Sequence, residues 1–300
     1  MEGSFDYLIV GAGSAGCVLA NRLSADPAVR VCLIEAGGSD ASPRVQIPAG
    51  TITLYKSKVF SWNYFSAPQK HLAGRRLHTP RGKALGGSSS MNSMIYIRGD
   101  ASDYDRWEAA GCPGWGWNDV LPYFKKSEGN CLGQSLHYHG TQGELLVDRP
   151  RDPNPLSERY IRAAEQIGLK RNDDFNGGSL EGVGLYNVTQ KNARRLSSYL
   201  AFVAPVRKRD NLVVLTGCEV ERLLLEGERV TGLELRQNGQ WRTLQCTRET
   251  ILCAGTLGSP HILLKSGIGP KAELEAAGVA CKVDLPGVGK NLQDHIDGTL

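Results

Sequence analysis

The chain has 300 residues, is 41% hydrophobic and 22% charged, and carries a formal net charge of +4. These values are ordinary for a globular protein, and because the basic residues are scattered they predict neither a polybasic tail nor a nucleic-acid-binding face. No stretch approaches the roughly 18 apolar residues that span a bilayer, and too few residues precede the first apolar run to form a signal peptide. We therefore expect a cytoplasmic location and no transmembrane segment, with peripheral membrane association as the alternative.

The cysteines and histidines do not form a metal-binding pattern. Eight cysteines lie at irregular spacings, and no two form a C-x-x-C pair, which argues against a zinc site and a disulfide scaffold and favours a reducing compartment. His137 and His139 point to opposite faces if the chain is extended there, and no acid or cysteine cluster accompanies them. We expect no metal site.

Residues 5–35 predict a strand, a glycine turn, a helix, a second strand and an acid, in that order. The apolar run Phe5–Val10 ends in the sequence GAGSAG, helical spacing follows, and a second apolar run, Val31–Ile34, ends in Glu35. This is the order of elements in a dinucleotide-binding βαβ unit.

The glycines of this unit each have a physical role. Gly11 permits the tight turn, Gly13 lets a pyrophosphate approach the backbone, and Gly16 lets the helix pack closely on the strand. The first helical turn, at Ser14 and Ala15, presents unpaired N–H groups to the anion. This segment is therefore the candidate pyrophosphate site.

The acid that closes the second strand is the candidate ribose ligand. Glu35 lies nineteen residues after Gly16, where a carboxylate can hydrogen-bond a ribose diol, and Ala36 follows it. A carboxylate here disfavours NADP, because it would repel a 2′-phosphate. The unit alone leaves NAD and FAD open.

The second half of the chain predicts one amphipathic helix and then β structure. The helix is Pro155–Gly168, and its apolar face is expected to pack in the core; the residues of that face are Leu156, Tyr160, Ala163, Ala164 and Ile167. Asn238-Gly239 is a strong hairpin signal. The expected strands are Leu212–Leu215, Val220–Leu225, Val230–Leu235, Trp241–Thr247 and Thr250–Cys253.

Two longer motifs carry a resemblance to a known family. Residues 82–92 read GKALGGSSSMN, and residues 255–269 read GTLGSPHILLKSGIG. Together with the N-terminal GAGSAG and EAGG, they resemble the signatures of the glucose–methanol–choline (GMC) oxidoreductases. The similarity extends over essentially the whole chain and is greatest to the bacterial alcohol and choline dehydrogenase branch.

The resemblance implies an α/β fold: a Rossmann-like FAD-binding domain with a β-meander, and part of an α+β substrate domain. We expect residues 1–140 to form the first part of the FAD-binding domain, 141–193 to start the substrate domain, and 194–300 to form the second, incomplete part of the FAD-binding domain. The cofactor residues implied by the resemblance, beside those named above, are Gly82, Ala84, Gly87, Ser88, Asn92, Ser93, Met94, Ile95, Val220 and Ala254.

The implied chemistry is oxidation of a primary alcohol, choline-like or aliphatic or aromatic, by hydride transfer to flavin N5. Some members of the family carry a histidine at the position of Met91 that bonds covalently to the flavin, and methionine cannot form that bond. We therefore expect non-covalent FAD. The alcohol, the electron acceptor (a quinone, oxygen or another carrier) and the oligomeric state stay open.

The catalytic residues are unknown at this point. None of the six histidines lies in the family's catalytic motif, so we expect the chain to be the N-terminal part of a longer enzyme. The alternatives are a catalytically incomplete module that at most binds FAD, and a GMC-fold oxidase, lyase or photodecarboxylase, since a fold alone does not fix the chemistry.

Overall fold

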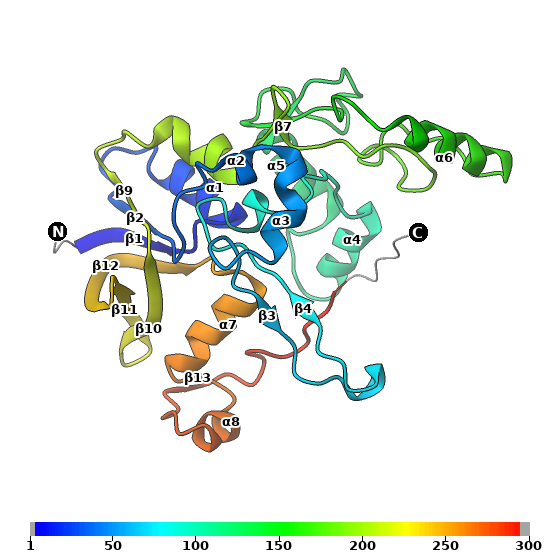
Figure 1. Ribbon diagram of the computed structural model, residues 1–300. Coiled ribbons are helices and arrows are strands. Elements are labelled where there is room, and N and C mark those ends of the chain that lie inside the picture. Colours follow the sequence, from blue (N-terminus) through cyan, green and yellow to red (C-terminus); the bar gives the residue numbers. More distant parts are fainter. Residues whose placement is uncertain (1–3, 295–300) are drawn as a thin grey trace. The chain divides into compact units, whose positions relative to one another are not determined.

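The computed structural model of the protein describes residues 4–294 (Figure 1). By compactness the chain divides into two units. The first is made of Met1–Asp40, Tyr55–Ser88 and Val203–Leu300, and the second of Ala41–Leu54 and Ser89–Phe202. The expected domain boundaries near residues 140 and 193 stay predictions.

The first unit is built on a six-stranded mixed sheet. Its strand order is β10-β11-β12-β1-β2-β9, with parallel pairing from β12 through β1 and β2 to β9, and antiparallel pairing within β10, β11 and β12. The strands are β1 (Ser4–Val10), β2 (Val31–Ile34), β9 (Leu212–Leu215), β10 (Cys218–Glu226), β11 (Arg229–Gln237) and β12 (Gln240–Leu252). This confirms the expected α/β class with a parallel-dominated sheet and a β-meander.

One strand is longer than expected. Trp241–Thr247 and Thr250–Cys253 were expected as two strands, but β12 runs without a break over Gln240–Leu252. Its first half pairs with β11 and its second half with β1, so it joins the meander to the parallel part of the sheet. The Asn238-Gly239 turn is confirmed: both residues have positive φ, +52° and +80°, as a two-residue hairpin loop of type I′ requires.

Short helices and strands complete the first unit. α1 (Ser14–Leu23) connects β1 to β2, and α7 (Gly255–Lys265) follows β12. The remaining elements are β3 (Tyr64–Phe65), β4 (His78–Thr79), β13 (Ile268–Gly269), α8 (Lys271–Ala276) and β14 (Val283–Asp284). The core lies between the sheet and α7, where Leu8, Ile34, Leu233, Leu235 and Ile262 are buried together.

The second unit is mainly helix and loop. Its helices are α2 (Pro43–Gln46), α3 (Thr51–Tyr55), α4 (Ala101–Ala109), α5 (Trp117–Ser127) and α6 (Pro155–Gln166), and its strands are β5 (Glu128–Asn130), β6 (Leu145–Val147), β7 (Gln190–Lys191) and β8 (Arg194–Arg195). The expected amphipathic helix is present as α6. The prediction that its apolar face packs in the core is wrong for Leu156, Tyr160 and Ile167, which are 64%, 59% and 81% exposed. It is also wrong for Ala163, which is exposed, and right for Ala164, which is buried. Amphipathic spacing identifies a face but does not say what covers it. Among the described residues no helix combines the length and apolarity needed to cross a membrane.

Candidate cofactor-binding site

The turn from β1 into α1 leaves the start of the helix open. Gly11 has φ of +101°, a conformation that side chains other than glycine rarely adopt. Gly13 is the N-cap of α1, and no side chain caps the helix. Ser14 and Ala15, in the first helical turn, are exposed. The first N–H groups of a helix have no intrahelical acceptor, so this end of α1 presents donors to an anion.

The three glycines of GAGSAG are required for different reasons. A Cβ on Gly11 would lie 2.4 Å from the carbonyl oxygen of Cys253, and one on Gly16 would lie 2.0 Å from that of Gly11. The fold itself therefore requires these two glycines. A Cβ on Gly13 would meet nothing closer than the Cα of Gly87, at 3.9 Å. The space beside Gly13 is not filled by the protein, which fits the approach of a bulky anionic group such as a pyrophosphate.

Glu35 closes β2 beside this turn. Its carboxylate accepts hydrogen bonds from the backbone N–H of Ala12 (3.0 Å) and of Gly37 (2.8 Å). Burial raises the pKa of Glu35 to about 7, against these two hydrogen bonds and the nearby charge of Lys83, which lower it. Each carboxylate oxygen has a second lone pair, so Glu35 can still accept a bond from a hydroxyl group.

The glycine-rich segment 82–88 contacts the GAGSAG turn and the residues that directly follow Glu35. Gly86 N–H donates to Ala12 O (2.7 Å), and Leu85 N–H donates to Gly38 O (2.9 Å). A Cβ on Gly87 would come within 2.7 Å of Gly13 Cα. Within the first unit, backbone contacts thus bring the GAGSAG turn and the GKALGGS segment together.

The other predicted positions of this segment and of the later strands are placed as follows. Gly82 N–H donates to Ser88 Oγ (3.1 Å), and Ala84 is buried and bridges to Gly38. Ala254 is the N-cap of α7, and a Cβ on Gly11 would lie 3.0 Å from its Cα.

Val220 and Ala36 are less directly connected to the turn. Val220 lies in β10, where it pairs with Leu235 and packs on the apolar core, and its contact with an adenine stays a prediction. Ala36 is half-buried and directly follows Glu35.

The remaining predicted residues belong to the second unit. Met94 is buried with φ of +61°, and its N–H donates to Asn92 Oδ1 (3.1 Å). Asn92, Ser93 and Ile95 are exposed, and Met91 is buried. The contacts of these residues with a flavin stay predictions.

The sequence analysis did not identify the side chain that fixes residues 89–92 by hydrogen bonds, which is Arg195. Arg195 is 2% exposed, and its guanidinium donates to Ser89 O (3.0 Å), Asn92 Oδ1 (3.0 Å), Thr51 Oγ1 (2.7 Å) and Val45 O (2.9 Å). It therefore ties three separate segments of the second unit together. In the sequence it is one of two adjacent arginines, and no local pattern distinguishes it from Arg194.

A buried ionic network in the second unit was also missed. His139 lies between Glu128 (Nδ1 to Oε1, 2.9 Å) and Asp174 (Nε2 to Oδ2, 3.0 Å), and Arg98 donates to the other oxygen of Glu128 (2.7 Å). Burial lowers the pKa of His139, but hydrogen bonds and charge from the two carboxylates more than offset this, and the net shift is upward. Burial raises the pKa of Glu128, and the bonds from His139 and Asn130 and the charge of Arg98 bring the net shift downward.

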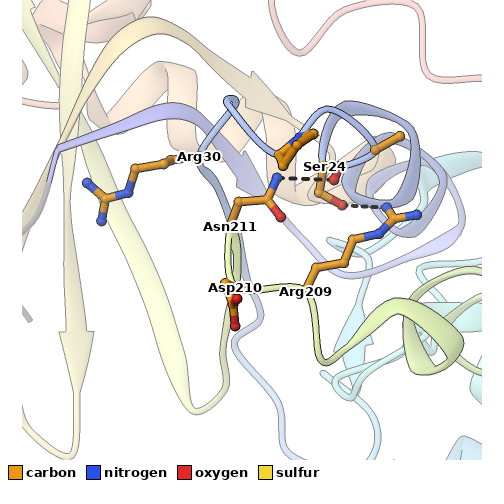
Figure 2. Close-up of a pocket in the computed structure, with 7 residues that line it drawn as sticks. Ser24, Arg30, Arg209, Asp210 and Asn211 are labelled. Carbon is orange, nitrogen blue, oxygen red and sulfur yellow. Dashed lines mark hydrogen bonds between the residues drawn. The ribbon is translucent and has the colours of Figure 1, made fainter.

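A separate recess lies at the C-terminal end of α1 (Figure 2). Its volume is about 520 Å³, and it is lined by Ser24, Ala25, Pro27, Arg30, Arg209, Asp210 and Asn211. Asn211 Nδ2 donates to three carbonyl groups of the 24–29 loop, and Arg209 donates to Ser24 Oγ (2.9 Å). These groups hold the loop in place, and none of the predicted cofactor residues lines the recess.

Known proteins match this chain in family, sequence and structure. The family model described as GMC oxidoreductase matches residues 5–297. The alcohol dehydrogenase [acceptor] of Pseudomonas putida is 48% identical over 298 residues, which are 99% of this chain and 54% of that protein. The oxygen-dependent choline dehydrogenase of Sinorhizobium fredii is 44% identical over 292 residues, 97% of this chain and 53% of that protein.

Solved structures of oxidases and oxidoreductases are also similar to this chain. Pyridoxine 4-oxidase from Mesorbium loti superposes with a TM-score of 0.93 at 41% identity, over 97% of this chain and 57% of that one. An FAD-dependent oxidoreductase from Chaetomium thermophilum gives 0.90 at 33% identity, over 97% of this chain and 52% of that one. The chain spans about half the length of the curated relatives it matches.

Proposed function

Because this chain belongs to the GMC oxidoreductase family, we propose that it is the FAD-binding part of an enzyme that oxidises the CH–OH group of a primary alcohol. The observation that carries the proposal is the open backbone at Gly13, at an uncapped helix start, beside two glycines that the fold itself requires. A glycine without a structural reason, beside free helix N–H groups, is explained by a ligand that must approach there.

Different residues of the first unit are proposed to bind different parts of the cofactor. The N–H groups of Ser14, Ala15 and Gly16 and the bare backbone of Gly13 receive the pyrophosphate. Glu35 accepts a hydrogen bond from a ribose hydroxyl, as its position at the end of β2 favours. The segment 82–88 supplies amide and hydroxyl donors along the same path.

FAD is the cofactor of this family, and when bound to these residues it would supply the hydride acceptor for the alcohol. We propose that the FAD of this chain is dissociable, since the Met91 thioether offers no covalent attachment. Asn92, Ser93, Met94 and Ile95 complete the proposed contacts. Ala36, Val220 and Ala254 are proposed to lie beside the adenine end.

The substrate class follows from the relatives. Two of them are named as an alcohol dehydrogenase and a choline dehydrogenase, which favours a small primary alcohol, choline-like or aliphatic or aromatic. The electron acceptor is not assigned. No histidine in residues 4–294 is proposed as the catalytic base: His139, for example, already lies between two carboxylates.

A second candidate is FAD binding without turnover, which one observation favours: the chain spans about half the length of its relatives. Both candidates are tested on one sample. The protein is titrated with FAD, followed by quenching of flavin fluorescence, and the complex is mixed without oxygen with a panel of primary alcohols and choline. Saturable binding followed by bleaching of the flavin band supports the first proposal. Binding without bleaching supports the second, and no binding contradicts both.

A further inference from the structure

The glycine- and serine-rich motif of residues 82–92 is divided between the two units of the chain. Residues 82–88 belong to the first unit, where they contact the GAGSAG turn, and residues 89–92 belong to the second. The proposed roles of the two parts differ as well. The first unit is proposed to receive the pyrophosphate, and residues 92–95 are proposed to contact the flavin. Residues 89–95 therefore need a support of their own.

Arg195, in β8, provides this support. Its side chain is 2% exposed, and one terminal nitrogen donates both to Ser89 O (3.0 Å) and to Asn92 Oδ1 (3.0 Å). Nε donates to Val45 O (2.9 Å) in α2, and the other terminal nitrogen donates to Thr51 Oγ1 (2.7 Å) in α3. A guanidinium presents its donors in one rigid plane, so these four bonds fix both ends of residues 89–92 against α2 and α3.

The same side chain sets the orientation of the Asn92 amide. Asn92 Oδ1 accepts hydrogen bonds from Arg195 and from the backbone N–H of Met94 (3.1 Å). Only the oxygen of a side-chain amide accepts hydrogen bonds, so the two donors identify this atom, and the NH₂ group lies on the other side of the amide. The NH₂ group is then the donor that Asn92 can offer to a bound molecule.

The backbone at Met94 depends on the same hairpin segment, residues 189–196. Met94 has φ of +61°, a conformation that residues other than glycine keep only where their surroundings fix it. Its N–H is fixed through Asn92 and Arg195, and its carbonyl accepts from the N–H of Thr189 (2.9 Å). Leu196 N–H, next to Arg195, donates in turn to Thr189 O (3.0 Å). Both polar backbone groups of Met94 are therefore held from this segment.

We infer that Arg195 is a positioning residue for the flavin end of the cofactor. It is buried and donates to protein acceptors, so it acts through Asn92 and Met94 rather than by touching the cofactor. A binding segment that is already held in place loses less conformational freedom when its ligand arrives, and it binds more tightly for that reason. The inference rests on the proposed FAD binding. It predicts that loss of Arg195 weakens binding of the flavin end and leaves binding of the pyrophosphate end unchanged.

The test compares FAD with ADP, which carries the adenine, ribose and diphosphate of FAD but no flavin. Both are titrated into the same protein by calorimetry. Arg195→Met should bind FAD roughly tenfold more weakly or worse and ADP within about twofold of the unchanged protein. Arg194→Met, at the neighbouring exposed arginine, should bind both like the unchanged protein. At saturating FAD, the visible circular dichroism of the bound flavin should change in Arg195→Met and not in Arg194→Met.

A milder pair of variants separates positioning from stability, because Arg195→Met is also expected to destabilise the second unit. Thr51→Val removes the hydroxyl that accepts from Arg195, and Thr51→Ser keeps it. Thr51→Val should bind FAD about threefold more weakly, and Thr51→Ser should bind it like the unchanged protein, with ADP affinity constant in both. Far-UV circular dichroism and the urea midpoint establish that each variant is folded under the conditions of the titration.

Two results overturn the inference. One is a parallel fall of FAD and ADP affinity, which would mean that Arg195 acts on the fold as a whole. The other is an unchanged FAD affinity in folded Arg195→Met and Thr51→Val proteins. Failure of the unchanged protein to bind FAD is a different result, because it contradicts the proposed function and this inference together.

Discussion

The backbones of Gly13 and Gly87 lie against each other, so closely that a Cβ on Gly87 would come within 2.7 Å of Gly13 Cα. These residues are 74 positions apart in the sequence and come from two of the motifs that carry the family resemblance, GAGSAG and GKALGGSSSMN. Their contact makes one surface of the helix start at α1 and the glycine-rich segment 82–88. That surface is the proposed binding site of the pyrophosphate.

Glu35 should make the stability of the protein without FAD fall as the pH rises. Its pKa is raised from 4.5 to about 7, so between these values the unfolded chain loses a proton that the folded chain keeps. The contribution of Glu35 to stability is largest below pH 4.5, falls through the window up to about 7 and is then constant, with a total change of about 3 kcal/mol. Urea unfolding at several pH values, compared with Glu35→Gln, measures the difference. If the difference in free energy of unfolding between the two proteins does not change between pH 4.5 and about 7, the raised pKa of Glu35 is excluded.

His139 should also make the stability of the protein fall as the pH rises, because carboxylates and not burial raise its pKa. Its pKa is raised above 6.5 by Glu128 and Asp174, so the stabilisation that it provides as a cation is fully present below the unfolded value and is lost as the pH rises through the folded one. His139→Gln should therefore be destabilised most at pH 6 and least at pH 9, and unfolding curves at both values check this. His137→Gln, at the neighbouring exposed histidine, is the control and should show little change at either pH.

Arg195 should be far more sensitive to substitution than its neighbour. Arg195→Met leaves the acceptors Ser89 O, Asn92 Oδ1 and Val45 O without their charged donor in a buried site, which costs about 3 kcal/mol or more. Arg194→Met removes one exposed bond to Gln46 and should cost less than about 1 kcal/mol. Urea unfolding distinguishes the two, and equal effects would show that the buried bonds do not stabilise the second unit.

Features of the fold and the site could be predicted from the sequence where the interacting residues are close together along the chain. The β1–α1–β2 unit, the position of Glu35 at the end of β2 and the Asn238-Gly239 turn are local patterns, in which a few adjacent residues dictate the backbone, and they were predicted correctly. The role of Glu35 as a ribose ligand stays a prediction. The network of His139, Glu128, Arg98 and Asp174 joins residues up to 76 positions apart, and no local pattern links them.

The same limit explains the errors in the strands and helices. The two expected strands that proved to be one, β12, have partners on different sides in each half, which periodicity cannot show. The apolar residues of α6 were expected in the core because amphipathic spacing usually means burial, yet Tyr160 and Ile167 are exposed. Only the folded chain shows which apolar face is covered.

The most direct test of the cofactor site is the FAD affinity of Gly13→Val. The fold has room for a Cβ at residue 13, since the nearest atom is Gly87 Cα at 3.9 Å and Gly13 has φ of −82°, a conformation open to any residue. Gly287→Val is the matched control, at another glycine with open space. We predict that Gly13→Val keeps the urea midpoint of the unchanged protein but loses FAD binding, while Gly287→Val keeps both. Unchanged FAD affinity in a folded Gly13→Val protein would mean that the pyrophosphate does not lie on this turn.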